Sequence, residues 1–318
     1  MSKLLTDEIR AEIKEILGRV VAQTVPVRWK SSERMPGAGE RRSFYRGQGD
    51  DFDGMVPYRA GDDPRKINWK AYAASGGTQV MTNVYRQITD IKAHILVDVN
   101  PSMNFGTARA TKRHLAAELV ASCIKSLDET KDRVGITFYS TNNVERILKA
   151  RGATSMLFPA LAGTLMTQPT QGAGQGFARS LKRLPTGRSL VFIVSDFMNM
   201  TDSDWDALRS AARRHDIVCL YVQDLREREL PDVRWGWGPM GWLTGLLGCF
   251  YTLQDFTGAK RTIWVSKKTR AQYAMNFRKH ESSVTARFKE YRCRWLIVST
   301  EEGDSAFPKI VKTLGGFR

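Results

Sequence analysis

The segment HILVDVNPSM (94–103) is an apolar run that ends in oxygen-bearing side chains. Its first half has the composition of a buried parallel strand. Asp98, Asn100 and Ser102 then alternate along a stretch that we predict to be extended, so their side chains can face one side. Three oxygen ligands on one side suit Mg²⁺, with Mn²⁺ or Ca²⁺ as alternatives. The spacing therefore predicts a cation site just beyond the end of this strand.

Two further loops carry oxygen donors toward the same place. LVFIVSDFMN (190–199) ends its apolar run at Ser195 and Asp196, and MTQPTQGAGQG (166–176) precedes a helical pattern. Ligands of open α/β sheets bind in the crevice beyond the carboxyl ends of the strands. An Asp that closes a strand is often only a turn former. Because three such loops follow different elements of one predicted sheet, we favour a shared site.

The elements that position these loops alternate along the chain. Predicted strands cover Ile95–Val99, Val134–Tyr139, Arg146–Leu148, Leu190–Ser195, Ile217–Val222 and Trp295–Ser299. Predicted helices cover Thr107–Leu127, Thr154–Ala162, Gly176–Leu184, Asp202–Arg214, Thr269–Tyr291 and Phe307–Leu314. Such alternation predicts an α/β fold, with a mostly parallel central sheet and helices on both faces.

The part of the chain before residue 90 has a different pattern. Apolar residues repeat at helical spacing over Leu4–Val21, and a glycine- and charge-rich region follows over Ser31–Gly77. We therefore predict an N-terminal helix and β/loop segment over residues 1–90 and the α/β domain over residues 91–318.

Composition limits the classes of protein that fit. The net charge is +16, and residues 260–318 carry 14 Lys and Arg against five Asp and Glu. The basic stretch 267–294 suits nucleic acid, an acidic protein or anionic lipid, and a solvated helix face is the simplest interpretation. Residues 235–254 carry no charge, but five glycines and a proline argue against a spanning helix.

Location follows from the cysteines and the first residues. The cysteines lie far apart in apolar settings, which is typical of reduced thiols inside a cell: Cys123, Cys219, Cys249 and Cys293. Acidic residues interrupt the N-terminal apolar residues, so no secretory signal is predicted. We expect a cytoplasmic protein without a membrane span, with peripheral attachment to a membrane as the alternative.

Catalytic motifs do not occur in this sequence. There is no GxSxG, HExxH or GxxxxGKS segment, and the histidines have no ligand spacing. A phosphatase of the haloacid dehalogenase type requires a second Asp two residues after the first, where Asn100 stands. We predict that the protein is not an enzyme. The alternative is a metal-dependent nuclease that uses Asp98, Asp196 and the basic C-terminal helix.

A long motif lies upstream, in RRSFYRGQGDDFDGMVPYRAGDDPRKINWKAYA (41–73). It resembles the bacterial domain-of-unknown-function family 58, marked by S-x-x-x-G-x-G-x-(D/E)-F and Y-x-x-G-D-D-x-R-x-I-(D/N)-W. The matching residues are Ser43, Gly47, Gly49, Asp51, Phe52, Tyr58, Gly61, Asp62, Asp63, Arg65, Ile67, Asn68 and Trp69. DFTGAKRTIWV, near the C-terminus, also resembles a stretch of that family, so the resemblance covers the chain from about Arg41. We expect the motif carboxylates to bind backbone N–H groups and Trp69 to pack on the neighbouring domain.

The strand-end loops carry a second resemblance. HILVDVNPSM and SDF resemble the von Willebrand factor A fold, whose metal-ion-dependent adhesion site uses DxSxS, a separate Thr and a separate Asp. The resemblance implies that Ser102, Asn100 and Thr170 bind Mg²⁺ directly, with Thr167 as the alternative threonine. It also implies that Asp98 and Asp196 hold metal-bound waters, leaving a position for a carboxylate of a partner protein. Asn100 stands where the pattern has Ser.

The two resemblances together imply a role in protein maturation. Relatives are typically associated with a MoxR-type AAA+ ATPase and assist maturation, or metal or cofactor insertion, of a client enzyme such as methanol dehydrogenase. Family members often carry two membrane helices near the N-terminus, and none is predicted here. The sequence thus predicts a non-enzymatic adaptor between ATPase and client. The rival is a basic nucleic-acid-binding protein.

Overall fold

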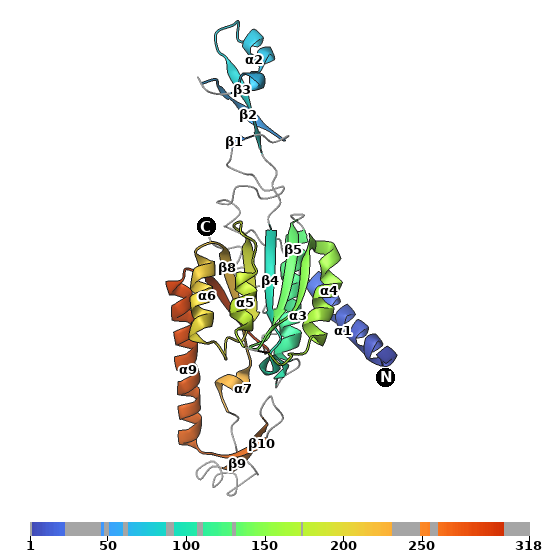
Figure 1. The fold of residues 1–318 in the computed structure, drawn as a ribbon, viewed down its shortest axis with the longest axis vertical. Helices are drawn as coiled ribbons and strands as arrows, with labels where there is room; N and C mark the ends of the chain where they lie inside the picture. Colours follow the sequence, from blue (N-terminus) through green and yellow to red (C-terminus); the bar gives the residue numbers. More distant parts are fainter. Residues whose placement is uncertain are drawn as a thin grey trace.

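The fold is taken from a computed structural model, which describes residues 2–22, 46–47, 51–59, 63–86, 92–106, 111–128, 132–172, 174–230, 249–254 and 260–301. Its main body is a six-stranded sheet in the order β11-β8-β7-β4-β5-β6 (Figure 1). The strands are β4 (Lys92–Asp98), β5 (Arg133–Tyr139), β6 (Val144–Gly152), β7 (Leu190–Ser195), β8 (Asp216–Gln223) and β11 (Arg294–Ser299). Only the β5–β6 pair in this sheet is antiparallel, so the predicted α/β class is confirmed.

Helices cover both faces of the sheet because its central strands are apolar on both sides. In β4, Ile95 and Val97 join a core with α3 (Lys112–Asp128) and α4 (Ala153–Met166). Leu96 joins the opposite core, made with three further helices. These are α5 (Gly176–Lys182), α6 (Asp202–Ala212) and α9 (Lys267–Glu290).

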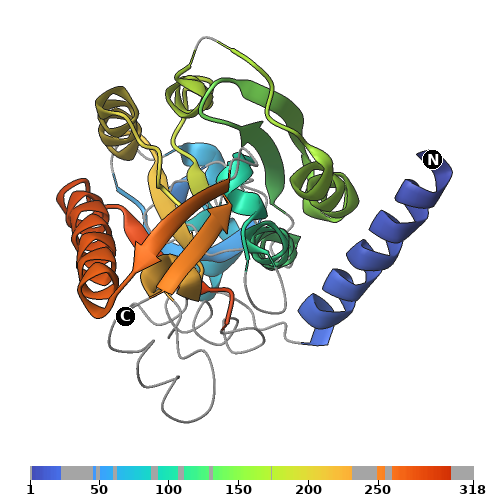
Figure 2. The ribbon, with the colours of Figure 1, turned by 90° about the horizontal axis from the view of Figure 1, so that it is seen from below.

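The N-terminal helix α1 (Ser2–Ala22) packs on the α/β domain (Figure 2). Its buried Ile13 and Ile16 meet Ala117 and Ala121 of α3, whose small side chains allow close approach, and Leu161 of α4. The amphipathic pattern of the sequence is therefore explained by this contact. The domain boundary at residue 90 stays a prediction.

Smaller units lie outside this layered body. A three-stranded sheet contains β1 (Arg46–Gly47), β2 (Asp51–Pro57) and β3 (Met81–Arg86). The short helices η2 (Pro64–Lys66) and α2 (Trp69–Ala74) lie between β2 and β3. After β8 come α7 (Leu225–Arg228) and the hairpin β9 (Cys249–Gln254)–β10 (Lys260–Val265). Figure 1 places the small sheet and this hairpin beyond opposite ends of the main body.

The family-like motif builds the small sheet and its helices. The Asp63 carboxylate accepts a hydrogen bond from the Arg65 backbone N–H at 3.0 Å, as expected for a turn. Asn68 caps α2 by accepting from the Ala71 N–H at 2.9 Å, and its amide donates to Asn83 of β3. Gly47 and Phe52 lie in β1 and β2, and Tyr58 follows β2; Gly49, Gly61 and Asp62 lie outside the described residues.

The expectation for Trp69 is wrong. Its side chain is 65% exposed and meets the ring of Tyr72 edge-on. The reason is its position on a six-residue helix that begins at the Asn68 cap, on the small unit rather than on the α/β domain.

The structure also bears on the predicted helix bounds, the membrane span and the cysteines. The helix predicted from Thr107 begins at Lys112, and residues 307–314 and 231–248 lie outside the described residues. No helix in the described ranges is long and apolar enough to cross a membrane. Cys123, Cys219 and Cys293 are buried free thiols.

Two helical glycines give matched tests of the packing. A Cβ added at Gly163 of α4 would clash with the Phe138 ring on β5, whereas nothing lies within 4 Å of one added at Gly18 of α1. Gly163→Ala should destabilise the protein by about 1–3 kcal/mol through overpacking. Gly18→Ala should stabilise it by up to about 1 kcal/mol through helix propensity. Urea denaturation measures both, and a Gly163→Ala midpoint at or above wild type would contradict the described contact.

Candidate functional site

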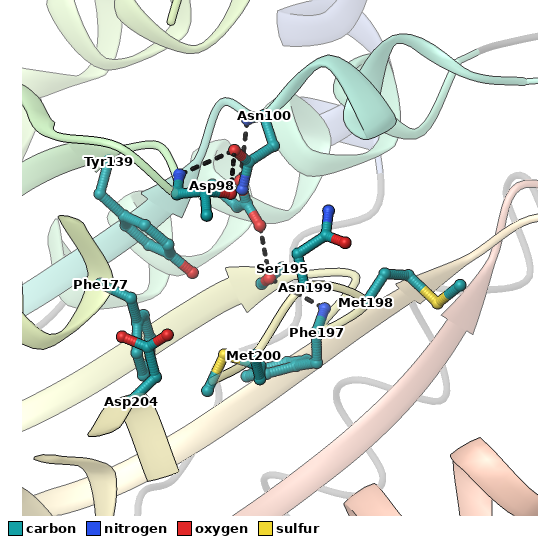
Figure 3. Close-up of a pocket in the computed structure, with 11 residues that line it drawn as sticks. Asp98, Asn100, Tyr139, Phe177, Ser195, Phe197, Met198, Asn199, Met200 and Asp204 are labelled. Carbon is teal, nitrogen blue, oxygen red and sulfur yellow. Dashed lines mark hydrogen bonds between the residues drawn. The ribbon is translucent and has the colours of Figure 1, made fainter. Parts of the chain in front are cut away.

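The carboxyl ends of β4 and β7 bring two of the predicted residues together. The strands are parallel neighbours, with Val97 opposite Val194, so the residues after them meet at one edge. Ser195 Oγ donates to Asp98 Oδ2 at 2.6 Å, and the Asn100 N–H donates to Asp98 Oδ1 at 2.8 Å (Figure 3). Both carboxylate oxygens of Asp98 are therefore engaged.

Asn100 and Ser102 lie in the loop after β4. Asn100 Oδ1 accepts from both the N–H and the hydroxyl of Thr141, each at 2.8 Å, in the turn between β5 and β6. Ser102 is the second residue of the short helix η3 (Pro101–Asn104). Its buried hydroxyl has no hydrogen-bond partner in the described part of the chain. Asn100 thus joins two loops, while Ser102 keeps an unused donor oxygen.

Asp196 faces a cation supplied by the protein itself. The ammonium of Lys112, the first residue of α3, lies 2.8 Å from Asp196 Oδ2 and 2.5 Å from Glu227 Oε1 of α7. Lys112 is fully buried. Burial alone would lower the pKa of Lys112, but the charges of Asp196 and Glu227 outweigh burial and raise it. Lys112 therefore carries a positive charge inside the protein.

The pKa of Asp98 is raised to about 7. Burial is the main cause and the nearby charge of Asp196 adds to it, while hydrogen bonds from Ser195 and Asn100 and the charge of Lys112 act in the opposite direction. Asp98 therefore changes charge near neutral pH.

A small pocket opens beside these groups (Figure 3). It is lined by Asp98, Asn100, Tyr139, Thr141, Phe177, Ser195, Phe197, Met198, Asn199, Met200 and Asp204. Phe197 has a left-handed backbone (φ 49°), and its N–H donates to Ser195 Oγ at 3.0 Å. A left-handed conformation is unfavourable for a bulky residue, so the loop after β7 is held in an unusual shape at the pocket.

Thr170 is bonded to β6. It is exposed, and its hydroxyl and N–H donate to the two carboxylate oxygens of Glu145 on β6, at 2.6 and 2.9 Å. Thr167, the alternative, ends α4 by donating its N–H to the Gly163 carbonyl. The structure therefore brings together Asp98, Asn100 and Asp196 with their loops, whereas the Thr170 hydroxyl is bonded to Glu145 on β6.

Sequence reasoning missed Thr141 and Lys112. Thr141 sits in a hairpin turn of ordinary composition, and a lysine opening a helix usually points to solvent. Ser195 was noticed only as part of the SDF segment. One signal could have pointed to Lys112. Two aspartates, Asp98 and Asp196, follow neighbouring strands, and buried carboxylates need a positive charge nearby.

The donors as arranged do not fit a divalent metal ion. Asn100 Oδ1 already accepts two hydrogen bonds, and Asp196 is paired with Lys112. Within the described ranges, no group of three or more His, Cys, Asp or Glu side chains is placed to hold a metal. Of the expected direct ligands, only the Ser102 hydroxyl makes no hydrogen bond within the described part of the chain. The Mg²⁺ site stays a prediction that this arrangement does not support.

The raised pKa of Asp98 predicts a pH-dependent stability. The native state binds the Asp98 proton more tightly than the unfolded chain does, so this residue lowers stability as pH rises from about 4 to about 7. Asp98→Asn should remove that loss, and the unfolding free energy of the variant relative to wild type should rise by up to ~1.4 kcal/mol per pH unit in this window.

Urea denaturation at pH 5, 6, 7 and 8 measures this difference. Asp206→Asn, which changes an exposed carboxylate of α6, is the control and should differ from wild type by a constant amount. A constant difference for Asp98→Asn as well would show that Asp98 is ionised throughout.

Comparison with known proteins gives relatives without an assigned role. An uncharacterized protein of Mycobacterium bovis and one of Mycobacterium tuberculosis are each 30% identical over 193 residues, covering 55% of this chain and 56% of each relative. The chain therefore spans about half the length of these relatives.

Solved structures of low sequence identity are also similar. The conserved hypothetical protein BatB from Bacteroides thetaiotaomicron has a TM-score of 0.41 at 12% identity, covering 71% of this chain and 98% of that one. An aerotolerance-related membrane protein from Bacteroides fragilis has a TM-score of 0.42 at 12% identity, covering 71% and 100%. A von Willebrand factor type A protein from Catenulispora acidiphila has a TM-score of 0.30 at 14% identity, covering 45% and 35%.

The family model described as "Protein of unknown function DUF58" matches residues 55–240. This match runs from β2 of the small sheet through the strand-end site and α7. The chain therefore belongs to the DUF58 family.

Proposed function

We propose that the protein is a non-enzymatic adaptor that docks a partner protein on the rim formed by the loops after β4, β5 and β7. The observation that carries this proposal is the exposed loop after β7. Met198 is 40% exposed and Asn199 is also exposed, while the residues immediately before them are buried and hydrogen-bonded. A rigid rim that presents a methionine suits protein recognition, because the thioether adapts to varied apolar surfaces.

The internal bonding of the rim favours recognition over catalysis. The carboxylates of Asp98 and Asp196 and the amide oxygen of Asn100 are all engaged by neighbouring loops. A serine–histidine pair does exist, with Ser189 Oγ 2.8 Å from His215 Nδ1, but both side chains are buried just before β7 and β8. That pair therefore lies at the amino-terminal ends of the strands, whereas Asp98 lies at the carboxyl-terminal end of β4.

The partners that fit this proposal are those implied by the family resemblance. A MoxR-type AAA+ ATPase would bind the rim, and a client enzyme awaiting maturation, or metal or cofactor insertion, would be the second partner. The client could be an enzyme like methanol dehydrogenase. We place this activity in the cytoplasm, in keeping with the sequence-based expectation.

A charge placed on the rim tests the docking surface. Met198→Glu should weaken binding to a MoxR-type ATPase from the same organism at least tenfold, because the substitution buries a carboxylate in the contact. Biolayer interferometry measures the affinity. Met275→Glu is the matched control, since Met275 is similarly exposed (46%) on α9, and should bind as wild type does. If both variants bind the ATPase with the same affinity, the rim is not the docking surface.

The rival function is nucleic-acid binding through α9, with a metal-dependent nuclease as its enzymatic form. Lys267, Lys268, Arg278, Lys279 and Lys289 are exposed on this helix. Phosphate binding by such residues would be steeply salt-dependent. We expect no retention of DNA or RNA in filter binding at low salt. Retention that is lost in the double variant Arg278→Ala, Lys279→Ala would favour the rival over the adaptor.

A further inference from the structure

We propose that the ammonium group of Lys112 is the built-in cation of the rim and holds the strand-end loops together without a divalent metal ion. The proposal follows from the placement of one positive charge among carboxylates that come from separate parts of the chain. Lys112 opens α3, Asp196 follows β7, and Glu227 lies in α7. The ammonium is 2.8 Å from the first carboxylate and 2.5 Å from the second.

Burial makes this contact a structural requirement. Lys112 has no exposed surface, and the side chains of Asp196 and Glu227 are only 3% and 15% exposed. A charge removed from water is tolerated when it is paired and hydrogen-bonded. Each of the three groups depends on the others, because two carboxylates this close would repel one another without the ammonium between them.

The surrounding bonds keep the three groups in place. Asp196 Oδ1 accepts from the Met198 N–H at 3.2 Å, which leaves Oδ2 for Lys112. Glu227 occupies the third position of α7 in a capping box with Asp224, so its carboxylate also fixes the start of that helix. The Lys112 N–H donates to the Phe105 carbonyl at 2.8 Å, which ties α3 to the end of the loop after β4.

The same bonds explain why a divalent ion has little to bind. A metal ligated by Asn100 would have to break both hydrogen bonds from Thr141, and one held through Asp196 would compete with a covalently attached ammonium. Competition within one chain strongly favours the attached group, because it pays no entropy of association. The rim of this protein is thus organised by a lysine where the sequence pattern predicted Mg²⁺.

The proposal gives Lys112 an effect that an ordinary core residue would lack. Lys112→Ala removes the ammonium and leaves the facing carboxylates of Asp196 and Glu227 with space between them. Two carboxylates that face one another are ligands for Mg²⁺, Mn²⁺ or Ca²⁺. The variant should therefore lose stability and then regain part of it when a divalent cation is added.

Thermal unfolding of the isolated full-length protein tests this, independently of whether any partner docks. Wild type should show the same Tm in EDTA and in 10 mM Mg²⁺. Lys112→Ala should unfold about 10 °C lower in EDTA and recover several degrees in Mg²⁺ or Ca²⁺. Lys279→Ala, which removes an exposed ammonium from α9, is the control and should match wild type in every buffer.

A second variant covers the case in which Lys112→Ala does not fold. Lys112→Met combined with Asp196→Asn and Glu227→Gln removes the ammonium and both opposing charges, and should fold with a Tm that is unaffected by Mg²⁺. A triple variant no more stable than Lys112→Ala would overturn the proposal. So would a wild-type Tm that rises in Mg²⁺ and loses that rise in Ser102→Ala, because the protein would then use a metal ion despite Lys112.

Discussion

Charge burial is the constraint on which the site depends. Asp98, Asp196 and Lys112 have almost no exposed surface, and each is stable there only through bonds to other loops. Lys112 joins α3 to the loop after β7 and to α7, while Asp98 joins the ends of β4 and β7. The apolar clusters hold the helices on the two faces of the sheet. The polar groups in turn hold the separate loops of the rim together as one surface.

The fold was largely predictable because it rests on local patterns. Apolar runs of strand length alternate with helical periods, and all six strands of the main sheet were anticipated with ends within a few residues. The segments that were missed depend on distant pairing. The hairpin β9–β10 joins residues 249–254 to 260–265, and its first strand lies at the end of the uncharged, glycine-containing stretch 235–254. Trp69 was misjudged because its exposure is set by the position of α2 on the small sheet.

The site was predictable only where strand order determines it. Asp98 and Asp196 each follow a strand of one parallel sheet, and adjacent strands bring such residues to the same edge. Lys112 could not be found in this way, because it is 84 residues from Asp196 and 115 from Glu227. Thr170 was implied by the family resemblance alone, and its hydroxyl bonds to Glu145 instead. The choice of cation thus depended on tertiary contacts alone.

A lysine in place of a metal ion suits the adaptor function that we propose, because the rim would keep its shape whatever the metal supply. The side-chain ammonium signal of Lys112 in ¹⁵N-lysine-labelled protein tests this claim most directly. A buried, hydrogen-bonded ammonium should give a proton-coupled ¹⁵Nζ signal that survives solvent exchange at pH 7 and is unchanged by Mg²⁺ or EDTA. Absence of that signal under Mg²⁺-free conditions, or its displacement by added Mg²⁺, would contradict the account.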